Sequence, residues 1–267
     1  MSPTSLAFIS GASSGIGKAT ALSLALQGYD LFLMARRENR LIELKKEIEN
    51  FLQQKNDNLS LKKPIKIYLF VGDVTSKSDV SRMLKENHSV LQNLSVLVNN
   101  AGLAKGSDPL HKNSLEDIDQ VIDTNVKGLL YITHQLLPFM LERKEGHIVN
   151  LGSVAGRWVY PGGTAYCASK FAVTAITEGL RQDLHGSGIR VTNIEPGMVE
   201  SEFSIVRFNS ESKAKSVYDG MTPLSPEDIA DCITWSLSRP KHVNIQEMVI
   251  YPTDQGGIRM VHRHENK

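Results

Sequence analysis

The sequence predicts a single α/β domain in which a parallel sheet of about seven strands carries helices on both faces. Short apolar runs alternate with stretches of helical periodicity along the whole chain, which is typical of a doubly wound sheet. A glycine-rich segment follows the first apolar run, where a strand would turn into a helix. No linker rich in Pro, Gly or Ser divides the 267 residues, so we expect residues 1–267 to form one domain.

The expected strands are apolar runs bounded by turn residues, at 6–10, 30–34, 65–71, 95–98, 146–150, 190–195 and 247–251. The expected helices show helical spacing, at 18–27, 38–51, 78–91, 117–140, a segment around 166–170, and 226–237. Ser225 before Pro226 is typical of a helix start. Residues 52–63 are predicted to be an exposed connection, and residues 198–226, long for a connection, are predicted to be a substrate lid.

Composition excludes several classes of protein. A net charge of +1 without a basic stripe argues against a nucleic-acid binder, and the absence of a run of about 18 apolar residues argues against a membrane span. Cys167 and Cys232 form no C-x-x-C pair, and no signal peptide is evident, so we expect a cytoplasmic protein. His262 and His264 lack further donors, which predicts no metal site and a solvated tail over residues 260–267.

The glycine-rich segment predicts a phosphate site. Its G-x-x-x-G-x-G spacing lets backbone N–H groups and a helix N-terminus approach an anionic phosphate without intervening side chains. A bare tight turn is the alternative. The candidate cofactor residues of the segment are Gly11, Ser13, Ser14, Gly15, Ile16 and Gly17.

The end of the second strand indicates the cofactor. About twenty residues after the glycine turn, NAD enzymes place an acidic residue for the ribose 2′-hydroxyl, whereas arginine there suits the 2′-phosphate of NADP. This chain has Arg36 and Arg37. We therefore favour NADP over NAD, the alternative being a solvated pair of arginines that opens the helix beginning at Glu38.

Polar and small residues recur at the ends of the expected strands. In parallel sheets the carboxyl ends of the strands share one edge, where ligands bind. The residues that would line this edge are Asp73 and Val74, Asn100, Ala101 and Gly102, Ser153, and Pro196 and Gly197.

Tyr166 and Lys170 stand four residues apart, so on a helix they would share one face. Lowering a tyrosine pKa from about 10 to about 7 requires roughly 4 kcal/mol. A cation at about 4 Å supplies about 4 kcal/mol at an effective dielectric of about 20. The pair is therefore a candidate general acid/base, although the same spacing also occurs in exposed surface pairs.

Two further features stand on the expected helices. Asn125 lies in the middle of a helix, where an amide is unfavourable without a partner, and it is either partnered or exposed. A stripe of small residues near Tyr166 would admit a close helix neighbour, which predicts self-association. The stripe consists of Ala168, Ala172, Ala175 and Gly179.

The ordered set of these motifs resembles the short-chain dehydrogenase/reductase family, whose fold is Rossmann-like and whose members are usually tetramers. The resemblance implies that Tyr166 exchanges a proton with the substrate oxygen and that Ser153 hydrogen-bonds this oxygen. It implies that Lys170 lowers the tyrosine pKa and binds the nicotinamide ribose, and that Asn125 holds a relay water. Asp73 and Val74 would border the adenine, and further cofactor contacts would come from Asn100, Ala101, Gly102, Tyr166, Pro196, Gly197 and Val199. Ser10 stands where many members have Thr.

A narrower resemblance links the chain to NADP-dependent 3-hydroxy acid dehydrogenases, which oxidise serine, 3-hydroxyisobutyrate or 3-hydroxypropionate. The segments that carry it are residues 202–208, 152–156 with 160–163, and 243–245. A carboxylate substrate favours arginine, which binds it in bidentate fashion. Arg207 and Arg157 are the candidates, and we expect Arg207, with Ser153 and Tyr166, to contact substrate.

Three other functions remain open. A broad-specificity carbonyl reductase shares the same motifs. A 3-oxoacyl reductase is disfavoured because residues 248–253 replace the Val-Asp-Gly-Gly segment that those enzymes usually carry. A sensor that binds NADP without turnover is disfavoured because the catalytic set is complete.

Overall fold

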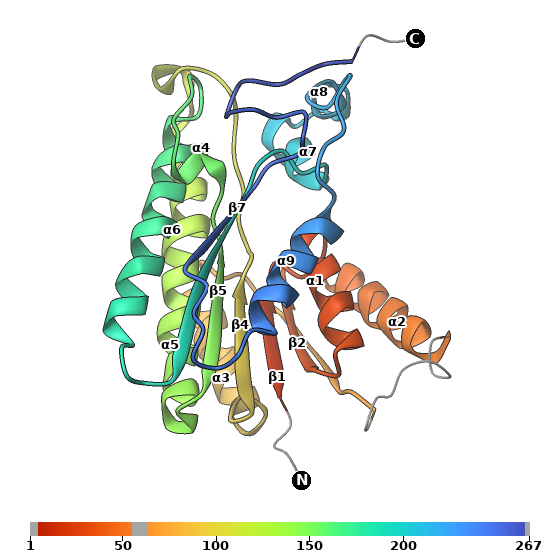
Figure 1. Cartoon of the computed structure of the whole chain (residues 1–267), viewed down its shortest axis with the longest axis vertical. Helices are drawn as coiled ribbons and strands as arrows, with labels where there is room; N and C mark the ends of the chain where they lie inside the picture. Colours follow the sequence, from red (N-terminus) through yellow and green to blue (C-terminus); the bar gives the residue numbers. More distant parts are fainter. Residues whose placement is uncertain (1–4, 55–63, 265–267) are drawn as a thin grey trace.

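A seven-stranded parallel sheet lies between two layers of helices in the computed structural model, which describes residues 5–54 and 64–264 (Figure 1). The strand order is β3-β2-β1-β4-β5-β6-β7. The strands are β1 (Leu6–Ser10), β2 (Asp30–Ala35), β3 (Ile67–Val71), β4 (Leu94–Asn99), β5 (Gly146–Leu151), β6 (Ile189–Pro196) and β7 (Glu247–Ile250). The predicted fold class is thereby confirmed.

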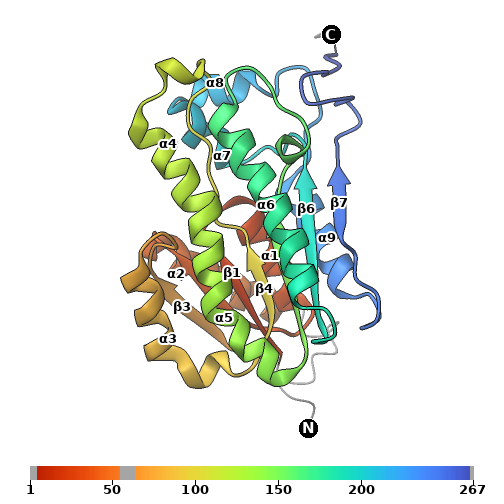
Figure 2. The ribbon, with the colours of Figure 1, turned by 90° about the vertical axis from the view of Figure 1, so that its left-hand side faces the viewer.

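The helices form the outer layers. They are α1 (Gly15–Leu26), α2 (Glu38–Gln54), α3 (Lys77–Leu91), α4 (Leu115–Ile122), α5 (Leu129–Arg143), α6 (Thr164–Asp183), α7 (Glu202–Phe208), α8 (Glu211–Ser216) and α9 (Pro226–Leu237). Figure 1 shows α1, α2 and α9 on one face of the sheet. Figure 2 shows α3, α5 and α6 on the other face.

The inner strands of the sheet are buried on both faces, and this explains why they read as unbroken apolar runs. Ala7 and Ile9 of β1 pack in the core beneath α1, α2 and α9. Leu6 and Phe8 point to the opposite core, beneath α3 and α5. Side chains that alternate along one strand therefore stabilise two separate cores.

The expected helix over residues 117–140 is wrong in detail. The chain forms α4, a π-helical turn (η2, Asp123–Gly128), and then α5. Asn125 lies in this turn and hydrogen-bonds the backbone of Leu103, and Val74 packs so close to Gly128 that a Cβ there would lie 2.6 Å from it. Contacts with residues far away in the sequence therefore accompany the change from an α-helical to a wider π-helical turn. Single-turn π segments are frequent at functional sites.

Residues 198–226 form a compact excursion above the sheet, containing α7 and α8. Its two ends are joined, because Glu200 N donates to Leu224 O at 2.9 Å and Leu224 N donates to Met198 O at 2.9 Å. The predicted start of α9 is confirmed: Ser225 accepts from Asp228 N in a capping box with Pro226 in the first turn. Of the expected connection 52–63, residues 52–54 end α2 and residues 55–63 lie outside the described residues.

Residues 260–264 are mostly exposed, as predicted for a solvated tail, but their backbone is hydrogen-bonded to other segments of the chain. His262 N donates to Asp254 O at 2.7 Å, and His264 N donates to Gly220 O at 2.6 Å. The His264 ring also pairs with the Asp254 carboxylate at 3.1 Å. This segment therefore packs against the excursion, and the predicted tail beyond residue 264 lies outside the described residues.

Candidate active site

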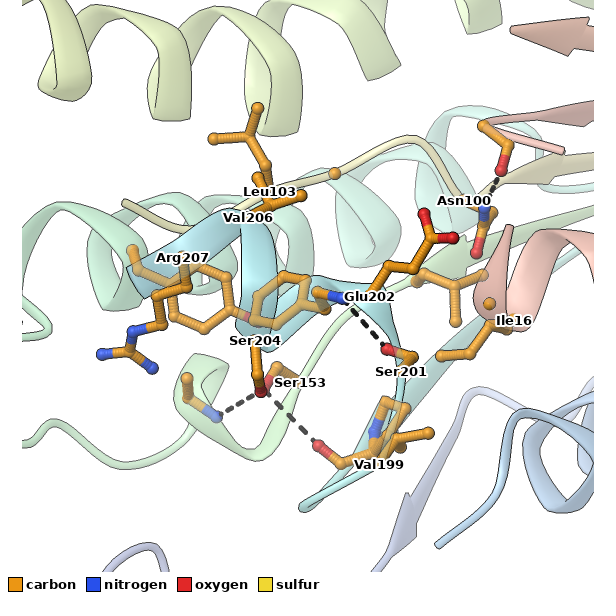
Figure 3. Close-up of a pocket in the computed structure, with 18 of the residues that line it drawn as sticks. Ile16, Asn100, Leu103, Ser153, Val199, Ser201, Glu202, Ser204, Val206 and Arg207 are labelled. Carbon is orange, nitrogen blue, oxygen red and sulfur yellow. Dashed lines mark hydrogen bonds between the residues drawn. The ribbon is translucent and has the colours of Figure 1, made fainter. Parts of the chain in front are cut away.

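A cleft of about 620 Å³ opens at the carboxyl ends of the strands. Residues of the loops after β1 to β6 and of α7 line the cleft. Figure 3 shows part of this lining, including Ile16, Asn100 and Ser153 from the loops and Glu202, Ser204 and Arg207 from α7. Of the predicted site residues, those that line it include Gly11, Ser13, Ser14, Gly15, Ile16, Arg36, Arg37, Asp73, Val74, Asn100, Ala101, Gly102, Ser153, Tyr166, Lys170, Pro196, Gly197, Val199 and Arg207.

The glycine turn is shaped for close approach. Gly11 and Gly15 have positive φ angles of 65° and 53°, which favour glycine. A Cβ at Gly17 would lie 2.4 Å from the Asn100 side chain, so no other residue fits there without a shift. Ser14, at the N-cap of α1, makes no capping bond with its side chain, so its hydroxyl does not occupy the first amide groups of the helix. These features suit an anionic phosphate.

Ser10 and Asn100 join β1 to β4 beneath this turn. The Ser10 hydroxyl accepts from Asn100 N and from Ala101 N, both at 3.1 Å. Asn100 Nδ2 donates to the carbonyl oxygens of Ser10 and Gly11 at 3.0 and 3.1 Å. The serine therefore keeps the hydroxyl contacts on which the fold of the turn depends.

Arg37 lies beside the glycine turn and faces oxygen atoms from several segments. Its guanidinium donates to the hydroxyls of Ser13, at 3.1 Å, and Ser14, at 2.8 Å, and pairs with the Glu202 carboxylate at 2.9 Å. Arg36 points to Asp73 Oδ2 at 3.6 Å, while Asp73 Oδ1 accepts from the backbone and hydroxyl of Thr75. A cradle of donors that already holds a carboxylate is chemically suited to a phosphate.

Tyr166, Ser153 and Lys170 meet at the other end of the cleft. Lys170 Nζ lies 5.8 Å from the centre of the Tyr166 ring and donates to Leu151 O at 2.7 Å. Ser153 Oγ accepts from Ala155 N at 3.1 Å, which fixes the hydroxyl at the turn after β5. The Tyr166 ring packs against Phe203 of α7 at a centroid distance of 5.7 Å.

Burial dominates the electrostatics of this group. Burial raises the pKa of Tyr166, and the hydrogen bond with Ser153 and the charge of Arg207 offset this only in part. Burial also lowers the pKa of Lys170 to about 8. Desolvation disfavours the charged forms of both side chains, and the lowering of the tyrosine pKa by Lys170 stays a prediction.

Asn125 is partnered, so the exposed alternative is wrong. Its side chain is 2% exposed. Oδ1 accepts from Leu103 N at 2.8 Å, and Nδ2 donates to Leu103 O at 2.8 Å and to Ser169 Oγ at 2.9 Å. The amide thus holds the loop after β4 against α6, and its part in a proton relay stays a prediction.

The two candidate arginines for substrate binding, Arg157 and Arg207, differ in their partners and in their position relative to the cleft. Arg157 forms ion pairs with Glu195 and Glu247 and does not line the cleft, so it is unsuited to bind substrate. Arg207 lines the cleft, with its guanidinium 5.4 Å from the centre of the Tyr160 ring and its Nε donating to Gly106 O at 3.0 Å.

Several residues that line the cleft were not predicted individually. Ser201, Glu202 and Phe203 fall within the predicted lid, Tyr160 falls within a segment that carries the narrower resemblance, and Arg259 falls in neither. Arg259 lies 5.7 Å from the centre of the Tyr160 ring and donates to Pro161 O at 2.6 Å. Within the described ranges neither Arg207 nor Arg259 has an ion pair. Nothing in the sequence around Arg259 except its positive charge indicates that it lines the cleft.

The cleft, with its glycine turn and its Ser-Tyr-Lys group, is that of a nucleotide-dependent oxidoreductase. The chain belongs to the short chain dehydrogenase family, whose model matches residues 5–212. Across residues 5–54 and 64–264, no helix is long and apolar enough to cross a membrane and no group of three or more His, Cys, Asp or Glu side chains is placed to hold a metal ion.

Individual relatives agree with this family. The NADP-dependent 3-hydroxy acid dehydrogenase YdfG of Escherichia coli K12 is 41% identical over 261 residues, covering 97% of this chain and 99% of that protein. Sulfoacetaldehyde reductase 2 of Chromohalobacter salexigens is 40% identical over 252 residues, covering 94% of this chain and 95% of that protein. The closed form of a serine dehydrogenase complexed with NADP⁺ matches with a TM-score of 0.85 and 40% identity, over 97% of this chain and 99% of that one.

Proposed function

We propose that this chain transfers a hydride between NADP(H) and a small 3-hydroxy acid or its carbonyl counterpart, with Tyr166 as the general acid/base. The observation that carries the proposal is the convergence of Tyr166, Ser153 and Lys170 at one end of a cleft whose other end has a phosphate-binding turn. Relatives at about 40% identity that are named NADP-dependent 3-hydroxy acid dehydrogenases support it.

NADP is favoured over NAD because of Arg37. Its guanidinium, together with the hydroxyls of Ser13 and Ser14, forms a cradle that suits the 2′-phosphate. The glycine turn would hold the pyrophosphate, Asp73 and Val74 would border the adenine, and residues 100–102 and 196–199 would border the rest of the cofactor. The bound cofactor supplies or accepts the hydride, and the protein positions the reactants.

The protein groups have separate tasks. Tyr166 gives a proton to, or takes one from, the substrate oxygen, and Ser153 holds this oxygen by a hydrogen bond. Lys170 stabilises the ionised tyrosine and contacts the nicotinamide ribose. Asn125 keeps the loop after β4 in place and takes part in proton transfer.

Charge along the cleft supports an acidic substrate. The acidic residues that line it, Asp73 and Glu202, pair with arginines near the glycine turn. Arg207 and Arg259, near Tyr160, have no carboxylate partner within the part of the chain that the structure describes. Arg207 would bind the acid group of the substrate, with Arg259 beside it, and residues 198–226 would act as the lid.

A sulfonate is the second candidate for the acid group. Sulfoacetaldehyde reductase 2 is as similar to this chain as several of the hydroxy acid dehydrogenases are. Sulfonates and carboxylates are both oxyanions that arginine binds, so the same cleft suits either. Broad-specificity carbonyl reduction, 3-oxoacyl reduction and cofactor sensing without turnover are the remaining alternatives.

We also propose that the chain is a cytoplasmic homo-oligomer, and specifically a tetramer, the usual assembly of the family that it resembles. The free thiols of Cys167 and Cys232 suit a reducing compartment. Ala168 and Ala175 lie exposed on α6, next to the exposed apolar side chains of Val159 and Phe171. Cell fractionation tests the location, and sedimentation tests the assembly.

The Tyr166→Phe variant tests the function. It removes the phenol oxygen and keeps the ring that packs on Phe203, so NADPH binding, measured by fluorescence, should persist. With saturating NADP and L-serine or 3-hydroxypropionate, kcat should fall by about a hundredfold or more, the scale of general acid/base catalysis. Undiminished turnover would refute the mechanism, and absence of turnover in the wild-type protein with every hydroxy acid, sulfonate and aldehyde tried would favour the sensor.

A further inference from the structure

Glu202, in the first turn of α7, reaches across the cleft to Arg37, between β2 and α2, and to Arg40 in the first turn of α2. Its Oε2 accepts from Arg37 Nη1 at 2.9 Å, and its Oε1 lies 3.6 Å from Arg40 Nη2. The Arg37 guanidinium is bound at the same time to the hydroxyls of Ser13 and Ser14. An oxyanion thus already lies among two arginines and two serines, at the place where a strand end meets the glycine turn.

The protonation state of Glu202 agrees with this description. Burial raises the pKa of Glu202, but the hydrogen bond from Arg37 and the charges of Arg37 and Arg40 outweigh burial and hold the pKa below its usual value. The side chain is therefore a carboxylate at neutral pH. It occupies the donors that the proposed function assigns to the 2′-phosphate of NADP.

We propose that Glu202 is a determinant of cofactor affinity that competes with the 2′-phosphate for Arg37. Both groups are oxyanions, and one guanidinium does not serve both at full strength without bringing like charges together. The inference rests on the proposed NADP function. In the opposite role, Glu202 would orient Arg37 for the phosphate. Removing the carboxylate would then weaken binding of the 2′-phosphate, whereas competition predicts that it strengthens this binding.

The competition connects the two ends of the cleft. Phe203, the next residue of α7, packs on Tyr166, and Arg207 at the end of the same helix contacts Tyr160. Figure 3 shows the side chains of Glu202 and Arg207 pointing away from one another. When the 2′-phosphate displaces Glu202, the first turn of α7 loses its tie to Arg37, and the helix that carries Arg207 is free to settle on the substrate.

Calorimetry with cofactor fragments tests the competition. Adenosine 2′,5′-bisphosphate and AMP, which differs from it only by lacking the 2′-phosphate, are titrated into the wild-type protein and the Glu202→Gln variant. We expect the variant to bind the bisphosphate about two- to fivefold more tightly, the range that an exposed ion pair is worth, and to bind AMP unchanged. Glu200→Gln is the matched control, since Glu200 is exposed, makes no described ion pair and lies two residues away. It should behave as the wild type.

The outcomes separate the competition from the proposed function. If the wild type prefers the bisphosphate over AMP and Glu202→Gln binds it equally or less tightly, the competition is refuted and the NADP assignment stands. If neither protein prefers the bisphosphate, both fall. Hydrogen exchange gives a second readout: the bisphosphate, but not AMP, should speed exchange of the α7 amides in the wild type. Unchanged exchange would refute the release of the helix.

Discussion

Arg207 and Arg259 lie against the same ring, that of Tyr160, although they are far apart in the sequence. Each is a cation that faces the cleft without a carboxylate partner among the residues described. Together they form the positive end of the cleft, opposite the end where Arg37 lies. Recognition of an acidic substrate at this end is therefore a property of two side chains whose proximity only the fold creates.

Removing either arginine should discriminate between acidic and neutral substrates. Arg207→Ala should raise KM for a hydroxy acid by about ten- to a hundredfold, the value of a charge-assisted hydrogen bond, and Arg259→Ala should raise it less. A neutral aldehyde of the same length should be reduced at an unchanged rate. Lys105→Ala is the control, because this nearby cation does not line the cleft. Equal losses for acidic and neutral substrates would refute the assignment.

For individual residues, the sequence predicts well which side chains lie at the site, but it predicts poorly which hydrogen bonds and ion pairs they form. The spacing of Tyr166 and Lys170 puts them on one helical face, and the structure brings Ser153 to them. Arg157 and Arg207 are indistinguishable in the sequence, since the carboxylates that engage Arg157 come from β6 and β7. The lowering of the tyrosine pKa by Lys170 stays a prediction, and the burial of both side chains that opposes it depends on packing that no local pattern encodes.

β5 carries His147 into the centre of the sheet, where its Nε2 lies 2.7 Å from Thr192 Oγ1 of β6. Burial, assisted by the charge of Arg190, lowers the pKa of His147 to about 3. The folded protein therefore keeps this ring neutral at a pH where the unfolded chain, with a pKa near 6.5, is protonated. Stability should fall as pH falls from about 6.5 towards 3.

The His147→Gln variant tests this linkage. For the wild type, the histidine should lower the free energy of unfolding by roughly 2 kcal/mol between pH 6.5 and pH 4.5, because the slope reaches about 1.4 kcal/mol for each pH unit only once the unfolded state is fully protonated. Glutamine does not titrate, so the variant should lose less stability over this interval, whatever its stability at pH 7. Urea unfolding at both pH values gives the comparison, and identical pH dependence in the two proteins would contradict the prediction.

The elements themselves are mostly predictable, and each exception has a physical cause. The strands and α1, α2, α3 and α9 follow from local apolar spacing and capping residues. The π-helical turn at Asn125 does not, because its hydrogen-bond partner, Leu103, lies 22 residues earlier in the chain. The short helices α7 and α8 begin at local N-cap residues, Ser201 and Ser210, but they are too short to show a helical apolar period in the sequence.

Alternation of strands and helices is enough to predict the whole molecule as a doubly wound sheet. The strand order, with β4 beside β1, does not follow from any local pattern, because pairing joins residues far apart in sequence. The packing of residues 260–264 against the excursion is another long-range feature, and it places Arg259 in the cleft.

Assembly can be tested on the stripe of small residues of α6. Ala175→Glu adds a charge to an exposed position, so it should leave the fold intact and shift sedimentation from the oligomer towards smaller species. Gln53→Glu adds the same charge to an exposed position of α2 in the other layer and should leave assembly unchanged. If Ala175→Glu sediments as the wild type does, α6 is not the contact face.

The switch in strand order between β1 and β4 divides the cleft by chain segment. The turn at residues 11–17, Arg37 and Asp73 come from the first hundred residues, whereas Tyr160, Tyr166, Arg207 and Arg259 come from residues beyond 150. A lineage can therefore acquire a new substrate through changes in the later half while it inherits its nucleotide preference unaltered. Glu202 is the exception, because it pairs with Arg37 and lies on the same helix as Arg207. A change at this one position would therefore affect both cofactor binding and substrate binding.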